Sequence, residues 1–373
     1  MNLTSVKLAN RNAVFNLIYK SKSISKIEIA NKLNLSLPTV SQYVNELKTT
    51  SLISDNQFFE STGGRKAAMV SFVEDYKIAI GVDIQKDSVH LVALNLLGEC
   101  FRESSQNLKF MNNNDYCVLL SNLIMNFFLE LNVARETLLG VGIAIQGLVD
   151  KSGQSVFFGD IMDADQFSIS MLHRYIPFKC ILRHDSEASA SYMLWKDKNL
   201  KEAFYLILNR YFGGVLIDNG KIHWGKSMPS GLVAHMTLKS NGKKCYCGKR
   251  GCVDAYCSAR ILEEDAGMPL SQFFSCVRNN EEYFVKLWHN YLDDLAATIY
   301  NLQIVTSIDV ILGGTIAKFM ISDDVNYLKS KVKKDTNISK EFPDIFIFSD
   351  TSSAAKGAAL FYIESFIDNF KKS

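Results

Sequence analysis

The hydrophobic pattern of this chain changes near residue 76, and the change divides the chain into two parts that need different architectures. Before it, apolar residues recur at helical spacing between short polar turns. After it come continuous apolar runs, the first at residues 78–84, of the kind that forms buried strands. A chain of 373 residues is long enough to hold more than one domain. We therefore predict a small helical module followed by a larger α/β body.

Capping residues set the limits of the predicted helices in the first module. Ser25, with Glu28 three residues later, forms a capping box at the start of the second helix. Asn34 suits a left-handed turn, and Ser36 caps the third helix, which has Pro38 in its first turn. The residues expected to face the core are Val14, Leu17 and Ile18, then Ile27, Ala30 and Leu33, then Leu35, Val40, Val44 and Leu47.

Two short helices joined by a tight turn predict a helix-turn-helix, and its second helix presents a small, polar, uncharged face. Such a face can enter the major groove and hydrogen-bond base edges. A hairpin of Leu52-Ile53 with Phe58-Phe59, followed by Gly63-Gly64 and two cations, predicts a wing that reaches phosphates or the minor groove. The predicted DNA-binding residues are Ser36, Thr39, Ser41, Gln42, Asn45, Arg65 and Lys66. A three-helix packing module without a DNA role is the alternative.

Positive charge is concentrated in the first part of the chain. Residues 1–70 hold nine lysines and arginines against four acids, whereas the whole chain has 41 basic and 39 acidic side chains. The excess predicts a polyanionic partner for the first module alone, although a solvated lysine-rich surface would carry the same charge. No apolar stretch is long enough to cross a bilayer, and the first residues lack the apolar core of a signal peptide. We expect a cytoplasmic protein with no membrane association.

Apolar runs and one amphipathic helix define the expected body. Residues 116–131 predict a helix with Leu119, Leu120, Leu123, Phe127 and Leu131 inside. Strands are expected at residues 78–84, 89–94, 139–145, 203–208 and 215–217. Because helices and strands alternate and a second set of strands begins near residue 203, we predict an α/β fold of two related lobes with a cleft between them.

Three of the eight cysteines, Cys245, Cys247 and Cys252, lie within eight residues in a loop with two glycines. In a reducing compartment such a cluster favours a metal ion over a disulfide. Tetrahedral zinc needs a fourth ligand besides three thiolates, and His235, ten residues upstream, is the nearest imidazole. Because four protein ligands close the coordination sphere, we predict a structural zinc ion. A reduced cysteine cluster without metal is the alternative.

Together these features resemble the ROK family of repressors and sugar kinases. The resemblance rests on the wing with Gly64-Arg65, the strand that ends in Asp83, residues 142–147, Asp185 and the cysteine loop with its upstream histidine. Gly313-Gly314 and residues 355–359 add to it. It implies an actin-like, ribonuclease-H-like body of two lobes, with zinc at the cysteine loop. We expect the winged helix-turn-helix at residues 1–75, the first lobe at 76–195, completed by a C-terminal helix at 358–373, and the second lobe at 196–357.

The resemblance does not extend to the phosphate-binding loops of the family's kinases. Those loops resemble Asp-x-Gly-x-Thr and Gly-Thr-Gly-x-Gly, whereas this chain has Asp83-Ile84-Gln85-Lys86-Asp87 and Asn209-Arg210-Tyr211-Phe212-Gly213. Phosphate needs the close approach of backbone amides, which bulky side chains prevent, and Asp87 would repel it. We predict no enzyme activity and no catalytic residues. An active ATP-dependent sugar kinase with an accessory DNA-binding module is the alternative.

The predicted ligand-binding residues are Asp185, His184, Glu187, His235 and Asp254. Asp185 matches the family's catalytic base and can accept a hydrogen bond from a sugar hydroxyl, and Asp160 is a further candidate. Leu232 replaces a glutamate that holds sugar hydroxyls in the family, and Asp254 is a shortened form of another. Losing one such bond costs roughly 1–3 kcal/mol, so we expect a sugar derivative or a different small ligand rather than a plain hexose.

The sequence thus predicts a sequence-specific transcription regulator, a repressor, whose degenerate kinase-like body senses a sugar or sugar derivative. One helix-turn-helix buries too little surface for operator selectivity, so a homodimer or homotetramer on a palindromic double-stranded operator is expected. Ligand binding could favour either the DNA-competent or the incompetent spacing of the two winged helices. A ligand-independent DNA-binding scaffold is a further alternative.

Overall fold

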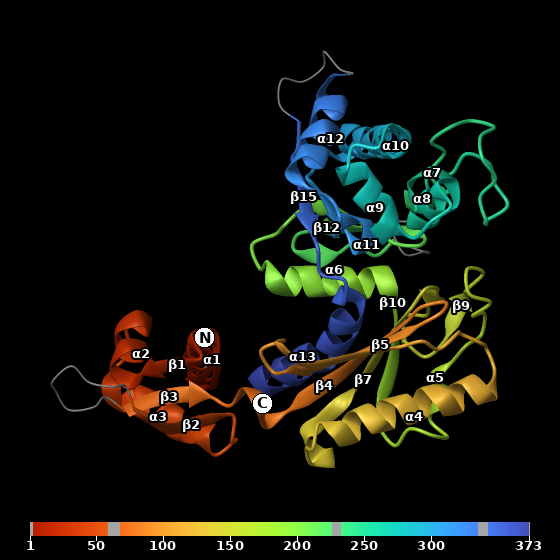
Figure 1. Ribbon diagram of the computed structural model, residues 1–373. Coiled ribbons are helices and arrows are strands. Elements are labelled where there is room, and N and C mark those ends of the chain that lie inside the picture. Colours follow the sequence, from red (N-terminus) through yellow and green to blue (C-terminus); the bar gives the residue numbers. More distant parts are fainter. Residues whose placement is uncertain (1–2, 59–67, 226–232, 335–341, 373) are drawn as a thin grey trace.

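The computed structural model describes residues 3–58, 68–225, 233–334 and 342–372, and it has three parts (Figure 1). A small N-terminal module lies beside the first of two five-stranded sheets. The second sheet and its helices lie on the other side of helix α6 (Asp185–Lys196). The mixed α/β body that the apolar runs predict is therefore confirmed.

The N-terminal module combines three helices with a three-stranded sheet in the order β1-β3-β2. The predicted capping box is confirmed, because Ser25 Oγ accepts a hydrogen bond from Glu28 N–H and the Glu28 carboxylate accepts one from Ser25 N–H. Asn34 is left-handed, with φ of 52°, and Ser36 Oγ accepts from Thr39 N–H, so the predicted turn is confirmed too. The elements are α1 (Leu3–Ser21), β1 (Ser23–Ser25), α2 (Lys26–Leu33), α3 (Leu37–Lys48), β2 (Ile53–Phe58) and β3 (Ala68–Phe72).

Two predicted core positions are wrong, both at the edge of a helical stripe. Ile27 is 59% exposed, and Ile29, two residues later, is fully buried in its place. Leu119 is exposed on α4 (Asn114–Glu130), where the predicted Leu120 is fully buried and Ile124 is fully buried as well. In both helices the core contact falls on a neighbouring position of the same turn, which apolar spacing alone does not distinguish.

The predicted hairpin is also wrong in its pairing. Residues 53–58 form the single strand β2, so its two ends cannot pair with each other. The partner of β2 is β3, with Ile53 opposite Phe72 and Phe58 opposite Ala68. The predicted phosphate contacts Arg65 and Lys66 lie outside the described residues.

The first lobe is built on a sheet with the order β10-β7-β4-β5-β6. Strands β4, β5 and β6 are antiparallel neighbours, and β7 and β10 run parallel to β4. One face of the sheet packs against α4 around Leu120 and Phe127. The remaining elements are η1 (Glu74–Tyr76), β4 (Ile78–Ile84), β5 (Val89–Asn95), β6 (Cys100–Gln106), η2 (Arg135–Thr137), β7 (Leu138–Ile145), β8 (Leu148–Val149), β9 (Val156–Phe158), α5 (Ile169–Leu172) and β10 (Cys180–His184).

The second lobe repeats this plan with the order β13-β12-β11-β14-β15. Strands β11, β12 and β13 are antiparallel neighbours, and β14 and β15 run parallel to β11, so the two lobes are related as the sequence predicts. The elements are β11 (Ala203–Leu208), β12 (Phe212–Asp218), β13 (Lys221–Ile222), η3 (Val233–His235), α7 (Asp254–Cys257), α8 (Ala259–Ala266), α9 (Leu270–Arg278), α10 (Glu282–Thr306), β14 (Val310–Gly313), α11 (Gly314–Ala317), α12 (Ser322–Lys334) and β15 (Ile345–Phe348). Within the described ranges, no helix is long and apolar enough to cross a membrane.

The C-terminal helix α13 (Ser353–Lys372) returns to the first lobe, and it begins five residues before the expected start at 358. It packs on β4, β7 and α6. Glycines allow this contact: a Cβ on Gly142 would lie 1.9 Å from the Ala358 carbonyl oxygen, and one on Gly357 would lie 1.6 Å from that of Ala188. Any side chain at these two positions would separate the helix from its neighbours.

The far end of α13 contacts the N-terminal module. The rings of Phe15 and Phe370 are 4.7 Å apart between centroids, and Asn12 Nδ2 donates to the Lys371 carbonyl at 2.7 Å. Tyr19 Oη donates to the Leu96 carbonyl of the first lobe at 2.7 Å. One hydrophobic cluster therefore runs from α1 and α3 through the first sheet to α13. The module is packed onto the body rather than tethered to it by a linker alone.

Candidate functional site

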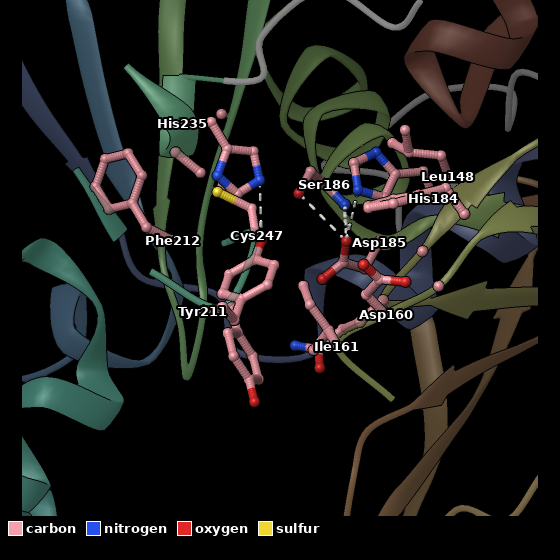
Figure 2. Close-up of a pocket in the computed structure, with 18 of the residues that line it drawn as sticks. Leu148, Asp160, Ile161, His184, Asp185, Ser186, Tyr211, Phe212, His235 and Cys247 are labelled. Atoms are coloured by element: carbon pink, nitrogen blue, oxygen red, sulfur yellow. Dashed lines mark hydrogen bonds and ion pairs between the residues drawn. The ribbon is translucent and has the colours of Figure 1, made fainter. Parts of the chain in front are cut away.

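A pocket of about 540 Å³ opens between the two lobes (Figure 2). The first lobe lines it with residues from the ends of β7, β9 and β10 and the start of α6, and the second lobe with residues from β11, β12, η3 and the cysteine loop. This is the size range in which proteins hold small-molecule ligands. The pocket lies where the two predicted lobes meet.

The first-lobe wall is acidic. Asp185 is the first residue of α6, and its Oδ1 accepts hydrogen bonds from Ser186 N–H at 2.7 Å and Ser186 Oγ at 3.2 Å. His184 Nε2 lies 3.3 Å from the same oxygen, and Asp160 lines the pocket beside them. Burial raises the pKa of Asp185 to about 6 and lowers the pKa of His184, so at pH 7 the wall presents a carboxylate and a neutral imidazole.

A second buried carboxylate, Asp83, belongs to the same electrostatic group. Gln85 Nε2 donates to Asp83 Oδ2 at 2.8 Å, which favours the ionised form. Burial nevertheless raises the pKa of Asp83, and the charge of Asp185 adds to this. The first lobe therefore holds two carboxylates whose ionised form is disfavoured by burial.

Replacing Asp185 with asparagine is expected to stabilise the protein at pH 7. The aspartate pKa rises from 3.8 to about 6 on folding, so this group favours the folded state most below pH 4, and that contribution is lost as the pH rises through 6. The asparagine side chain cannot ionise, and it should raise the free energy of unfolding at pH 7 by an amount on the order of 2 kcal/mol. Thermal melts at pH 4 and pH 7 measure this. The gain should shrink at pH 4, and the exposed control Asp218→Asn should show neither effect; equal gains at both pH values would contradict the assignment.

The second-lobe wall is aromatic. Tyr211 lies between β11 and β12, Phe212 is the first residue of β12, and Tyr246 belongs to the cysteine loop. The rings of Tyr211 and Tyr246 meet edge to face with centroids 5.4 Å apart, and Tyr246 Oη lies 3.2 Å from His235 Nε2. Figure 2 shows Tyr211 and His235 on the side of the pocket opposite Asp185 and Asp160. Sequence reasoning noted the bulk of Tyr211 and Phe212 but assigned no ligand contact to them.

Two predicted ligand contacts do not line the pocket. Asp254 is fully buried behind the wall, where its Oδ1 accepts from Phe212 N–H at 2.8 Å and its Oδ2 lies 3.6 Å from Arg260 Nη2. Glu187 is buried on α6 and is also absent from the lining. Of the five predicted residues, the pocket therefore brings together Asp185, His184 and His235. Asp254 instead fixes the backbone that carries the aromatic wall.

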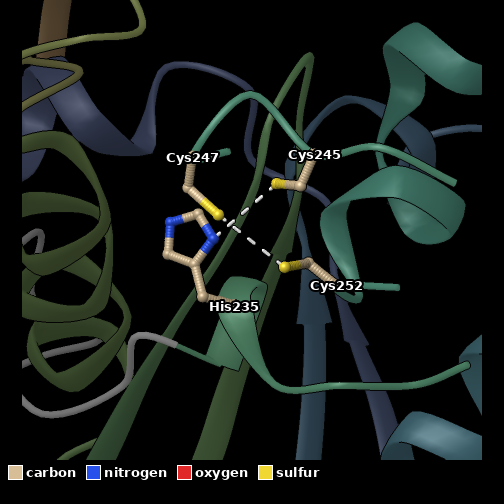
Figure 3. Close-up of side chains that lie close together, drawn as sticks. All are labelled: His235, Cys245, Cys247 and Cys252. Atoms are coloured by element: carbon tan, nitrogen blue, oxygen red, sulfur yellow. Dashed lines mark hydrogen bonds between the residues drawn. The ribbon is translucent and has the colours of Figure 1, made fainter. Parts of the chain in front are cut away.

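The predicted metal ligands His235, Cys245, Cys247 and Cys252 converge on one point (Figure 3). Their ligand atoms all lie within 4.8 Å of one another, a donor set that can hold a metal ion. His235 Nδ1 faces Cys245 Sγ at 3.8 Å, and Cys247 Sγ lies 3.7 Å from Cys252 Sγ. The loop needs its glycine at 251, where φ is +80° and a Cβ would lie 1.8 Å from the Lys239 carbonyl oxygen. Burial raises the pKa of Cys245 and Cys252, which a bound cation would offset.

The predicted DNA-reading side chains lie on one side of α3. Val40, Val44 and Leu47 are fully buried on the opposite side, as the periodicity predicts. The polar residues are exposed or half-buried, and they are Ser36, Thr39, Ser41, Gln42 and Asn45. The face carries no charge of its own, so hydrogen bonding is the chemistry it offers to a partner.

A small helical module with an exposed polar helix, packed on a two-lobed α/β body with an interlobe pocket, defines a winged-helix protein with a sugar-kinase-like body. The chain belongs to the ROK family, whose model matches residues 79–364. A model described as winged helix-turn-helix DNA-binding matches residues 9–53. The predicted family is thereby confirmed.

Among proteins with similar sequences is the xylose repressor of Bacillus subtilis (strain 168), which is 27% identical over 261 residues, 69% of this chain and 68% of the repressor. A ROK family transcriptional regulator described as a homologue of the E. coli MLC protein matches in structure with a TM-score of 0.75, at 15% identity and 98% coverage of both chains. The ROK hexokinase of Thermus thermophilus matches with a TM-score of 0.62 at 19% identity, over 78% of this chain and 99% of the hexokinase. The two structural matches show a fold that regulators and kinases share.

Proposed function

We propose that this protein is a sequence-specific DNA-binding transcriptional repressor whose interlobe pocket senses a sugar or sugar derivative. The observation that carries the proposal is a continuous chain of packing: α3 packs on α1, α1 packs on the end of α13, and α13 packs on α6. Helix α6 starts at the pocket residue Asp185. A ligand that changes how the lobes close can thereby shift the DNA-reading module. The similarity to a xylose repressor supports the same function.

The protein acts as a sensor and not as a kinase in this proposal, because both kinase loops are occupied by internal contacts. Asn209 Oδ1 accepts from Thr315 N–H at 2.8 Å and from Thr315 Oγ1 at 3.0 Å, at the turn into α11. Phe212 N–H is taken by Asp254. In the other loop, Gln85 N–H donates to the Ser88 carbonyl at 2.9 Å. These are amides that a phosphate cradle would need to have free.

The metal in the proposal is zinc, in a structural role. In a tetrahedral site with bonds of about 2.3 Å to sulfur and 2.0–2.1 Å to nitrogen, ligand atoms are roughly 3.5–3.8 Å apart. The contacts of 3.7 Å between Cys247 and Cys252 and 3.8 Å between Cys245 and His235 agree with these edges. His235 would bind through Nδ1 and donate from Nε2 to Tyr246, so the metal would orient an aromatic residue of the pocket.

The proposed DNA contacts are Ser36, Thr39, Ser41, Gln42 and Asn45 from α3, with Arg65 and Lys66 from the wing. A regulator typically binds its specific site with a free energy about 4–10 kcal/mol more favourable than random DNA, and a single reading helix does not reach this difference. A homodimer or homotetramer on a palindromic operator supplies two copies. A ligand must prefer the non-binding form by roughly 1.4 kcal/mol to weaken operator binding tenfold.

The test selects operators from random double-stranded DNA with the full chain and then measures affinity for the selected and random sequences. The expected result is a selected palindrome bound at least about a thousandfold more tightly than random DNA, with affinity that falls as salt rises. A panel of sugars and sugar derivatives should include one that changes the affinity tenfold or more. If the chain selects no DNA sequence, the proposal is contradicted. If no compound of the panel changes operator affinity, the ligand-independent scaffold is favoured. If any sugar causes ADP release from ATP, the kinase is favoured.

A further inference from the structure

We propose that the pocket ligand is a glycoside with an aromatic aglycone, whose sugar lies against Asp185 and whose ring lies against Tyr211 and Tyr246. This inference rests on the proposed function and names the ligand class of the same pocket. It starts from the unequal chemistry of the two walls, which Figure 2 shows facing each other.

The acidic wall suits hydroxyl groups. Asp185 and Asp160 are acceptors, and Ser186 adds a hydroxyl. Two buried polar atoms of lining residues, Gln146 Oε1 and His184 Nδ1, have no hydrogen-bond partner among the described residues. A group of this kind leaves hydrogen-bonding capacity unused until a polar ligand or water arrives. One sugar ring, which carries hydroxyls on several sides, can supply hydrogen bonds to this set of polar atoms.

The rest of the pocket suits an apolar ring. Tyr211, Phe212 and Tyr246 line it from the second lobe, and Phe157 and Phe158 line it from the first. The two phenylalanines are 53% and 41% exposed, an unfavourable state for adjacent aromatic side chains unless a ligand covers them. A cavity of about 540 Å³ holds more than one sugar ring, and an aromatic ring that packs against aromatic side chains adds a favourable contact to the burial of its surface.

The aromatic wall is already held in position. Tyr246 contacts His235 of the metal centre through its hydroxyl, and Tyr211 rests on the Tyr246 ring. The Arg260 guanidinium lies 5.7 Å from the Tyr211 ring centroid, and Arg260 Nη1 donates to both carboxylate oxygens of Glu264 at 3.0 Å, which holds the arginine in place. A wall whose rotamers are fixed before binding loses little entropy when a ring stacks on it.

The charges of the pocket argue against phosphorylated ligands. Among the described residues, its charged side chains are Asp160 and Asp185 against Lys249, and His184 is neutral at pH 7 because burial lowers its pKa. A net negative pocket repels a sugar phosphate or a nucleotide. A neutral glycoside meets no such barrier.

The test compares methyl and 4-nitrophenyl forms of β-D-glucopyranoside, β-D-xylopyranoside and N-acetyl-β-D-glucosaminide by isothermal titration of the full chain. For the sugar that binds, we expect the aryl form to bind at least tenfold more tightly than the methyl form. Tyr211→Ala should bring the ratio of aryl to methyl glycoside affinity close to one, and Tyr211→Phe should retain the wild-type ratio. Asp185→Asn should weaken both forms together, and the surface control Tyr283→Ala should change neither.

Equal binding of the methyl and aryl forms, or binding of neither for all three sugars, overturns the inference. Operator affinity is measured on the same samples, so that failure of this inference can be distinguished from failure of the proposed function. If free sugars or methyl glycosides alter DNA binding and aryl glycosides do not, only the aromatic subsite is wrong. If the chain selects no DNA sequence, the proposed function fails whatever the glycosides do.

Discussion

Cys247→Ser is expected to lose the bound metal and to lower the stability of the second lobe. A serine hydroxyl does not replace a thiolate as a zinc ligand, and the remaining Cys245, Cys252 and His235 leave the ion with an open position. Metal content measured by mass spectrometry should fall from about one ion per chain to near zero. The free energy of unfolding should fall by about 3 kcal/mol or more, roughly 6–12 °C in Tm for a unit of this size.

The control for this variant is Cys276→Ser. Both cysteines are half-buried, but Cys276 lies on α9 and is not part of the metal group. It should keep the metal and nearly all of its stability. A strong chelator should reproduce the Cys247→Ser melting curve in the wild type and change the variant little. Full metal content in Cys247→Ser would show that the site is misassigned.

The metal variant also tests whether the loop supports the pocket. Tyr246 lies between two metal ligands in sequence and contacts His235, so loss of the ion should loosen the aromatic wall. Binding of any pocket ligand should weaken along with stability. The DNA-reading face, which packs through α1 and α13 on the first lobe, should keep its affinity for random DNA.

Local signals in the sequence predicted local structure well. Ser25, Glu28, Asn34 and Ser36 act on backbone groups within one turn, so their roles do not depend on the rest of the fold. The grouping of the four candidate metal ligands was predictable for a similar reason, because three of them share one short loop. Ile27 fails because its burial depends on what lies opposite α2, and spacing does not specify that.

The pocket was only half predictable. Asp185 and His184 follow directly from the end of a strand, and the family resemblance identified them. Asp254 was assigned to the ligand, but the fold turns it toward Phe212 N–H, a contact across 42 residues that no local pattern encodes. Tyr211 and Tyr246 meet only when the loops after β11 and before α7 come together. The signal for Tyr211 was the loss of glycine from a phosphate loop, which indicates what the site no longer does rather than what it binds.

The double variant Gln42→Ala with Asn45→Ala is expected to abolish sequence preference while leaving general DNA binding intact. Both side chains are exposed on α3 and carry amides, which can make paired hydrogen bonds to adenine in the major groove. Each such contact discriminates by about 1–3 kcal/mol, so affinity for the selected operator should fall about 5- to 150-fold per residue. Alanine favours helix, so α3 should remain folded.

The salt dependence separates a lost base contact from a lost phosphate contact. Neither side chain is charged, so the slope of affinity against salt concentration and the affinity for random DNA should match the wild type. Gln272→Ala removes an exposed glutamine from α9 in the second lobe and should change nothing. If operator and random DNA lose affinity equally, the face positions the protein on the backbone and does not read bases. If neither changes, α3 is not the reading helix.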